Sequence, residues 1–181
     1  PGSIFVHHDA TCRLCSFGLS CDTSDAFSQS RLAASGGTPA YMSPEHTTRT
    51  RRAVDSRSDL YSLGIVLYEL LTGRLPFELS ADDQTNWAHY HIASEPLAPG
   101  RVRPDVPGML STIILKLLEK NPENRYQTVD GLIADLRRCQ ATLTAEGEIV
   151  DFIPGQQDRS PAIHLADSLF SAHPQASDVI A

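Results

Sequence analysis

Two cysteines and two histidines near the start of the chain have the chemistry of metal ligands. Cys12 and Cys15 are separated by two residues, and His7 and His8 precede them. Thiolate and imidazole groups at short spacing are ligands that zinc prefers. Residues 11–17, however, alternate as a half-buried strand does, which places the two cysteines on opposite faces. No second ligand pair of conventional spacing follows, so the sequence favours a strand over a zinc site.

A run of arginines within residues 46–58 is a second group that could do chemistry, by binding an anion. Such a run is usually a solvated face, and that interpretation is favoured. Hydroxyl side chains in residues 19–36 could be phosphorylated and then pair with residues 49–52. Because Ser-rich loops are common without regulation, the unregulated alternative is favoured. The arginines are Arg49, Arg51, Arg52 and Arg57, and the hydroxyl residues are Thr23, Ser24, Ser28, Ser30 and Ser35.

The first elements expected to position these groups are a small β-hairpin and a short helix start. Residues 4–6 and 12–17 are β-runs on either side of a turn. After the polar loop that follows, Ser43 is expected to cap a helix start. Pro44 is tolerated in the first turn, and Glu45 faces the positive end of the helix dipole.

A long apolar helix is expected to form the centre of the domain. Ser58 is expected to cap a helix over residues 59–72, which Gly73 terminates. Because this segment is apolar nearly all round, we expect it to be buried on most sides. It is too short and carries Glu69, so it does not predict a membrane span.

Three further helices complete the expected domain, which is mainly α with a small β-hairpin. A helix over about residues 82–93 carries Trp87 and Tyr90 at one-turn spacing, which indicates packing rather than a ligand site. Residues 109–120 are amphipathic with helical period. Thr128 is expected to cap a last helix, and the periodicity fades beyond about residue 141.

Composition indicates one acidic domain with a tail. The chain has 181 residues, of which 41% are hydrophobic and 20% charged, and its formal net charge is −7. This charge gives no general attraction to nucleic acid or anionic membrane, so neither is expected as a partner. Four cysteines do not make a disulfide scaffold, which predicts a cytoplasmic location. No signal peptide is evident, and the start at Pro1 rather than Met indicates a fragment.

Several motifs follow one another in an order and spacing that carry a family resemblance. They are Ser16-Phe17-Gly18, Gly37-Thr38, Tyr41, Ser43-Pro44-Glu45, Asp59, Gly64, and Arg125 within Asn121-Pro-Glu-Asn-Arg-Tyr. The set resembles the C-terminal lobe of eukaryotic-type Ser/Thr protein kinases, with Asp-Phe-Gly and Ala-Pro-Glu as the matching family motifs. The resemblance covers residues 1–140 and implies a protein-kinase-like C-terminal lobe without its N-terminal lobe. The activation segment would span about residues 16–45.

The resemblance also implies roles for matched residues. Glu45 and Arg125 would form a buried ion pair that ties the activation segment to the lobe, and breaking such a pair leaves an uncompensated charge. Asp59 would brace the catalytic loop. The Thr38 hydroxyl would meet the catalytic aspartate near the substrate hydroxyl. The expected substrate-side residues are Gly37, Thr38 and Tyr41, and the expected structural anchors are Ser43, Pro44, Glu45, Asp59 and Arg125.

The groups that transfer phosphate are not intact in this sequence. The reaction needs a Gly-rich loop, a nucleotide lysine, a catalytic aspartate, and Asp plus Asn on magnesium. Only Lys116 and Lys120 are present, and both belong to the late amphipathic helix. By resemblance Ser3 stands at the metal-binding Asn position and Ser16 at the Asp position. The parent family uses ATP and magnesium, whereas no cofactor, metal or phosphate transfer is expected for this chain.

The wider sequence is similar to kinase modules that head large bacterial signalling proteins, where an ATPase module and a sensor histidine kinase follow. Residues 54–64, 123–128 and 134–139 carry this similarity, and residues 152–158 and 168–170 resemble the junction into the ATPase module. Residues 141–181 are accordingly expected to be a linker or the start of a truncated module. The expected partners are a protein partner or substrate, the missing N-terminal lobe and downstream signalling modules.

Three functional hypotheses stay open from the sequence. The first is a fragment of an active Ser/Thr kinase. The second is a pseudokinase lobe that acts as a binding or scaffold module, presenting the Trp87 helix and residues 19–52. The third is a remnant of a disrupted gene. Upstream sequence with or without the nucleotide-binding motifs would discriminate between them.

Overall fold

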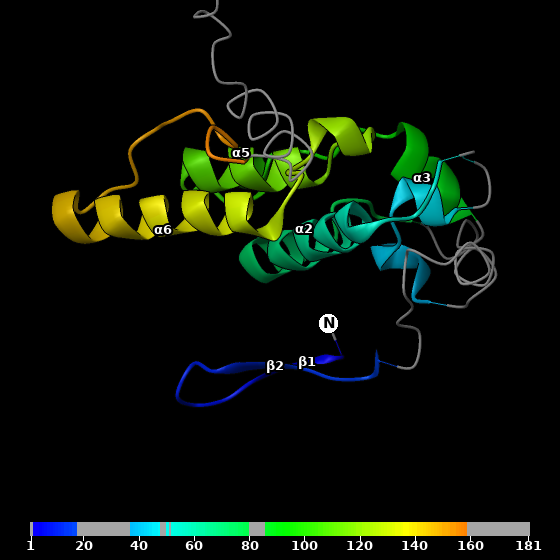
Figure 1. The fold of residues 1–181 in the computed structure, drawn as a ribbon, viewed down its shortest axis with the longest axis horizontal. Helices are drawn as coiled ribbons and strands as arrows, with labels where there is room; N and C mark the ends of the chain where they lie inside the picture. Colours follow the sequence, from blue (N-terminus) through cyan, green and yellow to red (C-terminus); the bar gives the residue numbers. More distant parts are fainter. Residues whose placement is uncertain (1, 18–36, 48–49, 51, 80–85, 159–181) are drawn as a thin grey trace, which may run out of the picture.

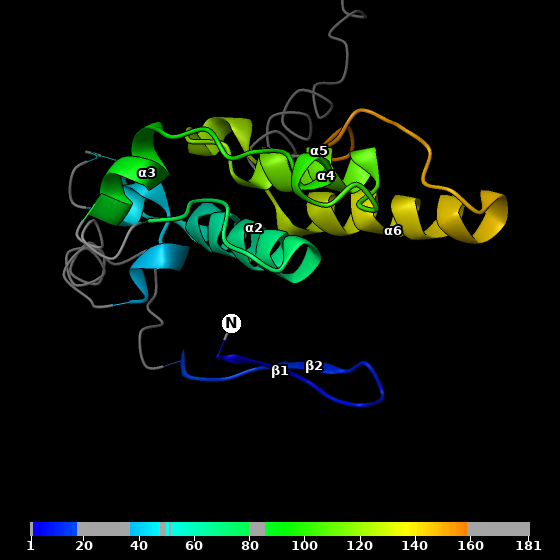
Figure 2. The same ribbon diagram turned by 180° about the vertical axis from the view of Figure 1, so that it is seen from behind.

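The computed structural model describes residues 2–17, 37–47, 50, 52–79 and 86–158 (Figures 1 and 2). Thr23, Ser24, Ser28, Ser30, Ser35, Arg49 and Arg51 lie outside the described residues. The elements in chain order are β1 (Ile4–Val6), β2 (Cys12–Leu14), the 3-10 helices η2 (Pro39–Tyr41) and η3 (Pro44–His46), α2 (Ser56–Thr72), α3 (Trp87–Ala93), α4 (Pro99–Val102), α5 (Gly108–Leu117), η5 (Pro122–Asn124) and α6 (Val129–Glu146). The mainly α fold with a small hairpin is confirmed.

The chain opens with the predicted β-hairpin. The two strands pair antiparallel, with Ile4 opposite Leu14. β2 ends earlier than predicted, because the chain turns at Ser16, which has a φ of 65°. The Cys15 amide still donates to the Ser3 carbonyl at 3.0 Å, so the pairing continues one step past the strand. The hairpin lies apart from the helices, on the side of α2 (Figures 1 and 2).

Two serines predicted to cap helices do something else. α2 begins at Ser56, and its cap is Asp55, whose carboxylate accepts from the Arg57 amide at 2.8 Å. Asp55 is extended and offers a charged acceptor earlier in the chain, so Ser58 lies inside the first turn. The Ser43 hydroxyl likewise makes no cap and bonds the His46 ring at 2.8 Å. The predicted end of α2 at Gly73 is confirmed, with a φ of 75°.

α2 is the centre of the lobe, as predicted. Of its 17 residues only Ser56, Asp59 and Leu70 are exposed, so the helix is covered on most sides. It contributes to both buried apolar clusters. The first joins α2 to α5 and α6 through Leu60, Met109, Ile113, Leu117, Tyr126, Leu132 and Cys139. The second comprises Tyr61, Ile65, Tyr68, Phe77, Ile114 and Leu118, and Trp87 and Tyr90 of α3 pack against it.

The last helix is longer than its sequence pattern indicated. Thr128 caps α6 as predicted, accepting from the Gly131 amide at 3.0 Å, but the helix continues to Glu146. The chain then returns from the far end of α6 toward α5 (Figure 1). Ile149 and Phe152 of this returning segment pack against the first cluster. Within the described residues, no helix has the length and apolar character that crossing a membrane requires.

Candidate substrate-side site

The loop of residues 37–42 is fastened to α2 through Tyr41. The Tyr41 hydroxyl donates to the Glu69 carboxylate at 2.7 Å, and the Ser62 hydroxyl donates to the Tyr41 carbonyl at 2.8 Å. Burial and the Glu69 carboxylate raise the pKa of Tyr41, so its hydroxyl stays a donor. Both the side chain and the backbone of Tyr41 are therefore fixed relative to the central helix.

His91 of α3 holds the same loop from the other side. The His91 ring is 0% exposed, and its Nε2 lies 2.9 Å from the Pro39 carbonyl. Because a carbonyl only accepts, Nε2 carries the proton, and Nδ1 accepts from the Tyr61 hydroxyl at 3.0 Å. Trp87 stacks on the ring, and Phe77 meets it edge-on. Burial lowers the pKa of His91 to about 4, which keeps the ring neutral at pH 7.

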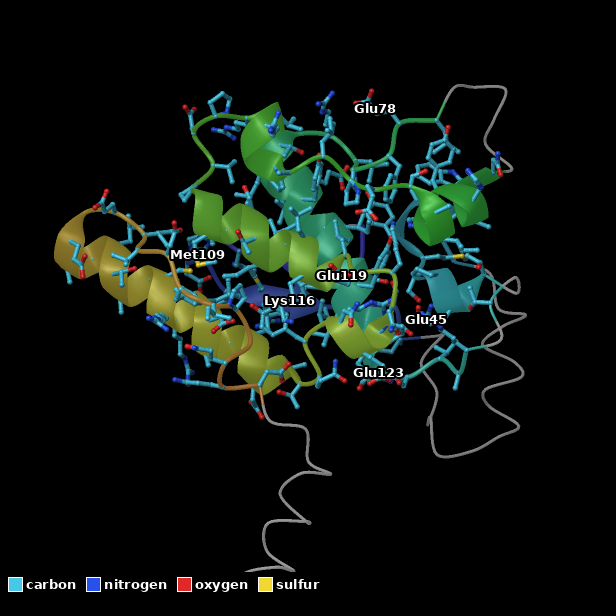
Figure 3. All side chains as sticks on the ribbon, turned by 90° about the horizontal axis from the view of Figure 1, so that it is seen from above. Glu45, Glu78, Met109, Lys116, Glu119 and Glu123 are labelled. Atoms are coloured by element: carbon cyan, nitrogen blue, oxygen red, sulfur yellow. The ribbon has the colours of Figure 1, made fainter. Side chains whose placement is uncertain are left out.

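The implied Glu45–Arg125 ion pair is present and buried. Arg125 donates through Nη1 to Oε1 of Glu45 at 2.6 Å and through Nη2 to Oε2 at 2.9 Å. The Ser58 hydroxyl also donates to Oε1, at 2.7 Å. Burial alone would raise the pKa of Glu45, but these hydrogen bonds and the Arg125 charge hold it below its usual range. In Figure 3 Glu45 lies next to the segment that carries Glu119 and Glu123.

The remaining donors of Arg125 are also used. Its Nε donates to the Glu119 carbonyl at 2.8 Å, and Nη1 donates to the Arg57 carbonyl at 3.1 Å. The guanidinium lies 4.9 Å from the centre of the Tyr61 ring. Arg125 thus ties together η3, the start of α2 and the turn before η5, which positions the loop that precedes Glu45.

Ser3 and Ser16 are brought to the same end of the hairpin, where the resemblance places the metal ligands. Both are exposed, and the Ser16 hydroxyl lies 3.4 Å from Cys15 Sγ. Magnesium binds hard anionic oxygens, and two neutral hydroxyls do not supply them. Across the described part of the chain, no group of three or more His, Cys, Asp or Glu residues is placed to hold a metal ion. The residues at these positions therefore do not fit magnesium.

Thr38, Gly37 and Asp59 are less constrained than the anchors. Gly37 and Thr38 are exposed at the start of the loop. Asp59 is exposed in the first turn of α2, and its carboxylate takes part in none of the hydrogen bonds or ion pairs among the described residues. The structure brings Tyr41, Ser43, Pro44, Glu45 and Arg125 together around α2. The bracing role of Asp59 and the substrate-facing role of Thr38 stay predictions.

Three contributors to this site were missed from the sequence: His91, Ser58 and Ser62. His91 follows Trp87 by one turn in a segment interpreted as packing only. The available signal was a histidine on the apolar face of a short helix, which needs partners for both ring nitrogens when buried. Ser58 was interpreted as a cap, which hid its role as a donor to Glu45.

Comparison with known proteins identifies the class that this fold and site define. The model of the protein kinase domain family matches residues 1–135. Serine/threonine-protein kinase PknB of Mycobacterium leprae is 39% identical over 141 residues, which are 78% of this chain and 22% of that protein. PknB of Mycolicibacterium smegmatis is 40% identical over 141 residues, 76% of this chain and 22% of that protein. The chain belongs to the protein kinase domain family.

A third relative has a different overall organisation. The hybrid signal transduction histidine kinase G of Dictyostelium discoideum is 47% identical over 104 residues, 58% of this chain and 3% of that protein. The chain spans about a fifth of the length of the PknB relatives. The resemblance therefore covers only a small part of each of these proteins.

Proposed function

We propose that this chain is the substrate-side lobe of a protein Ser/Thr kinase and that it does not transfer phosphate by itself. The observation that carries the proposal is the loop of residues 37–42, which is anchored at Pro39 and Tyr41. Tyr41 of the loop bonds Glu69 of α2, and the Pro39 carbonyl bonds His91 of α3. The Glu45–Arg125 pair fixes the chain just after the loop. Residues 37–39 at the start of this loop are exposed, and the residues that follow them are anchored. An exposed segment on an anchored base suits the alignment of a protein substrate for phosphoryl transfer.

We expect no turnover by the chain alone, because its residues at the metal positions have changed. Ser3 and Ser16 replace the two metal-binding side chains of the resemblance, and the only lysines, Lys116 and Lys120, lie at α5 and just after it. Two neutral hydroxyls at these positions do not supply the hard anionic oxygens that hold magnesium, and neither lysine belongs to the hairpin. The groups with which the family offsets the charge of a transferring phosphoryl group are therefore replaced at these positions. We expect no ATP or magnesium to be bound by the chain itself, and we propose a cytoplasmic location with protein partners only.

The direct test is an assay of the full chain with radiolabelled ATP, magnesium and a mixed protein substrate. We expect no labelled protein above a sample without the chain, and no thermal shift with Mg-ATP. Turnover by the chain would overturn this part of the proposal.

A chimera tests the substrate-side role separately. The part of Mycolicibacterium smegmatis PknB that precedes the matched segment would be joined to this chain, once unchanged and once with Ser3→Asn and Ser16→Asp. We expect labelled substrate only from the chimera with both replacements, and less of it after Thr38→Ala. If the doubly replaced chimera folds and stays inactive, the substrate-side role is wrong.

The second candidate is a pseudokinase lobe that acts as a scaffold in bacterial signal transduction. Ser3 and Ser16 favour it, because two neutral side chains at metal positions would also weaken a longer parent protein. The chimera distinguishes the two candidates: activity in the unchanged chimera contradicts the scaffold role, because Ser3 and Ser16 would then be compatible with catalysis.

A further inference from the structure

The segment after α6 packs back onto the lobe. We call residues 149–158 the strap. Ile149 and Phe152 pack against the cluster shared by α2, α5 and α6. The Arg138 guanidinium lies 4.4 Å from the centre of the Phe152 ring, and the Phe152 amide donates to the Met109 sulfur at 3.3 Å. Figure 1 shows this segment, in orange, beside α5.

Polar contacts fix the end of the strap at the start of α6. The Asp158 carboxylate accepts from the amides of Gln127 and Thr128, and also from the Thr128 hydroxyl at 2.7 Å. Amides at a helix start have no partner within the helix and need an acceptor. Further back in the strap, the Gly155 amide donates to the Asp135 carboxylate at 2.6 Å.

Two glycines make room for this segment. A Cβ on Gly131 would lie 2.5 Å from the side chain of Asp158. Gly155 has a φ of +80°, and its Cβ would lie 2.9 Å from Lys116 Cε. In Figure 3 the orange strap passes close to Lys116. The surface of α5 and α6 is thus shaped for a segment with glycine and aspartate at these positions.

The groups that hold the strap lie next to the Glu45–Arg125 pair, which fixes the chain after the loop of residues 37–42; we call residues 37–45 the substrate-side loop. Asp135 accepts from the Gly155 amide and also from the Tyr126 hydroxyl, at 2.6 Å in each case. Tyr126 directly follows Arg125, whose partner is Glu45. Residues 125–128 therefore carry the anchor at one end and the strap contacts at the other.

We propose that the strap is a docked connector, which couples the chain beyond residue 158 to the loop that ends at Glu45. While it is docked, Asp158 and Asp135 hold residues 126–128 in place, and Arg125 is thereby held against Glu45. Release of the strap leaves the amides of Gln127 and Thr128 without their acceptor. The backbone that carries Arg125 then becomes less constrained. A module that follows the strap could change the substrate-side loop by pulling on it.

Hydrogen exchange on the full chain tests this proposal with a matched pair of variants. Asp158→Asn removes the docking carboxylate, whereas Asp151→Asn removes an exposed carboxylate of the same segment. In Asp158→Asn we expect exchange to rise about tenfold in residues 127–131 and 149–158, and also in residues 43–47. The α5 amides should not change. In Asp151→Asn all of these segments should stay within about twofold of the parent chain.

A second variant should release the strap without changing Asp158. Gly155→Ala should displace the strap by backbone strain at its φ of +80°, and it should give the same pattern as Asp158→Asn. Unchanged exchange in residues 43–47 in both variants would overturn the coupling. Absence of protection in residues 149–158 of the parent chain would overturn the docking. An equal rise in α5 would show global unfolding instead and would also contradict the proposal.

Discussion

At the scale of single residues, the role of Arg125 as an anchor requires the planar shape of its guanidinium as well as its charge. Its planar fork meets both oxygens of Glu45, and its other N–H groups reach the carbonyls of Glu119 and Arg57. A lysine has one terminal nitrogen and could not fill these positions together. The pair is 1% and 3% exposed, so it is shielded from water and salt.

The first prediction is that Glu45→Gln strongly destabilises the lobe. The variant keeps the size of the side chain but leaves the Arg125 charge buried without compensation, which costs about 3–5 kcal/mol in the free energy of unfolding. Urea unfolding at pH 7 measures it. Glu123→Gln is the control, because Glu123 also pairs with an arginine but is 68% exposed, and we expect a cost below about 1 kcal/mol. Equal costs in the two variants would contradict the buried pair.

The second prediction concerns the pH dependence that His91 gives to stability. The unfolded pKa of 6.5 falls to about 4 in the folded lobe. Below pH 6.5 His91 therefore binds a proton in the unfolded chain but stays neutral in the folded lobe, so the free energy of unfolding falls as the pH falls. Between pH 7 and pH 5 this loss is about 2 kcal/mol. Urea unfolding at both pH values measures it.

Two variants isolate the contribution of His91 to this pH dependence. His91→Gln retains a donor for the Pro39 carbonyl and does not titrate, so most of the difference between pH 7 and pH 5 should disappear. Burial also lowers the pKa of His46, which contributes with the same sign and remains in the variant. His89→Gln removes an exposed histidine of the same helix and should leave the difference unchanged. A full difference in His91→Gln would show that His91 is not the source.

At the scale of elements, periodicity predicted where helices lie better than it predicted how they begin. Alternation or apolar spacing predicted the hairpin, α2, α5 and α6, with bounds that lie within a few residues of the observed ones. The cap of α2 did not follow, because both Asp55 and Ser58 are good capping residues and the tertiary partner Glu45 decided between them. A local sequence pattern cannot predict a cap that depends on a contact with a residue distant in sequence.

The third prediction belongs to the contact between α2 and α5. A Cβ on Gly64 would lie 2.8 Å from the Cβ of Leu117 and 3.0 Å from Leu118. Gly64→Ala should therefore push the two helices apart and lower the free energy of unfolding by about 1–3 kcal/mol. Gly108→Ala is the control in α5, since nothing lies within 4 Å of its Cβ and alanine favours a helix. Thermal unfolding should show a lower midpoint for the first variant only.

At the scale of the whole molecule, the sequence led to the class of fold through a set of motifs rather than through any one of them. The Glu45–Arg125 pair joins residues that are 80 positions apart, and only the family resemblance brought them together in advance. His91 and the strap had no such guide. Ile149 and Phe152 supply the apolar contacts of the strap, and two apolar residues make no hydrophobic period to detect. Its other contacts come from the Asp158 carboxylate, from backbone amides, and from the space left at Gly131 and Gly155.

The fourth prediction is that the lobe extends at least to residue 158 and does not end at residue 140, where the sequence placed the start of a linker. A chain ending at residue 147 loses the packing of Ile149 and Phe152 and the acceptor Asp158. Partial burial of two apolar side chains and a cap together predict a loss of at least about 2 kcal/mol in the free energy of unfolding.

The control for this truncation is a chain that ends at residue 158, compared with the full chain by urea unfolding. The contacts that hold the strap, as described above, are all made within the chain up to residue 158, so we expect the two to unfold at the same urea concentration. If the chain ending at residue 147 is as stable as both, the strap contributes no stability and residues 148–158 behave as a linker. If it alone is destabilised, the segment that resembles a junction is part of the kinase lobe and is held on a surface formed by α5 and α6.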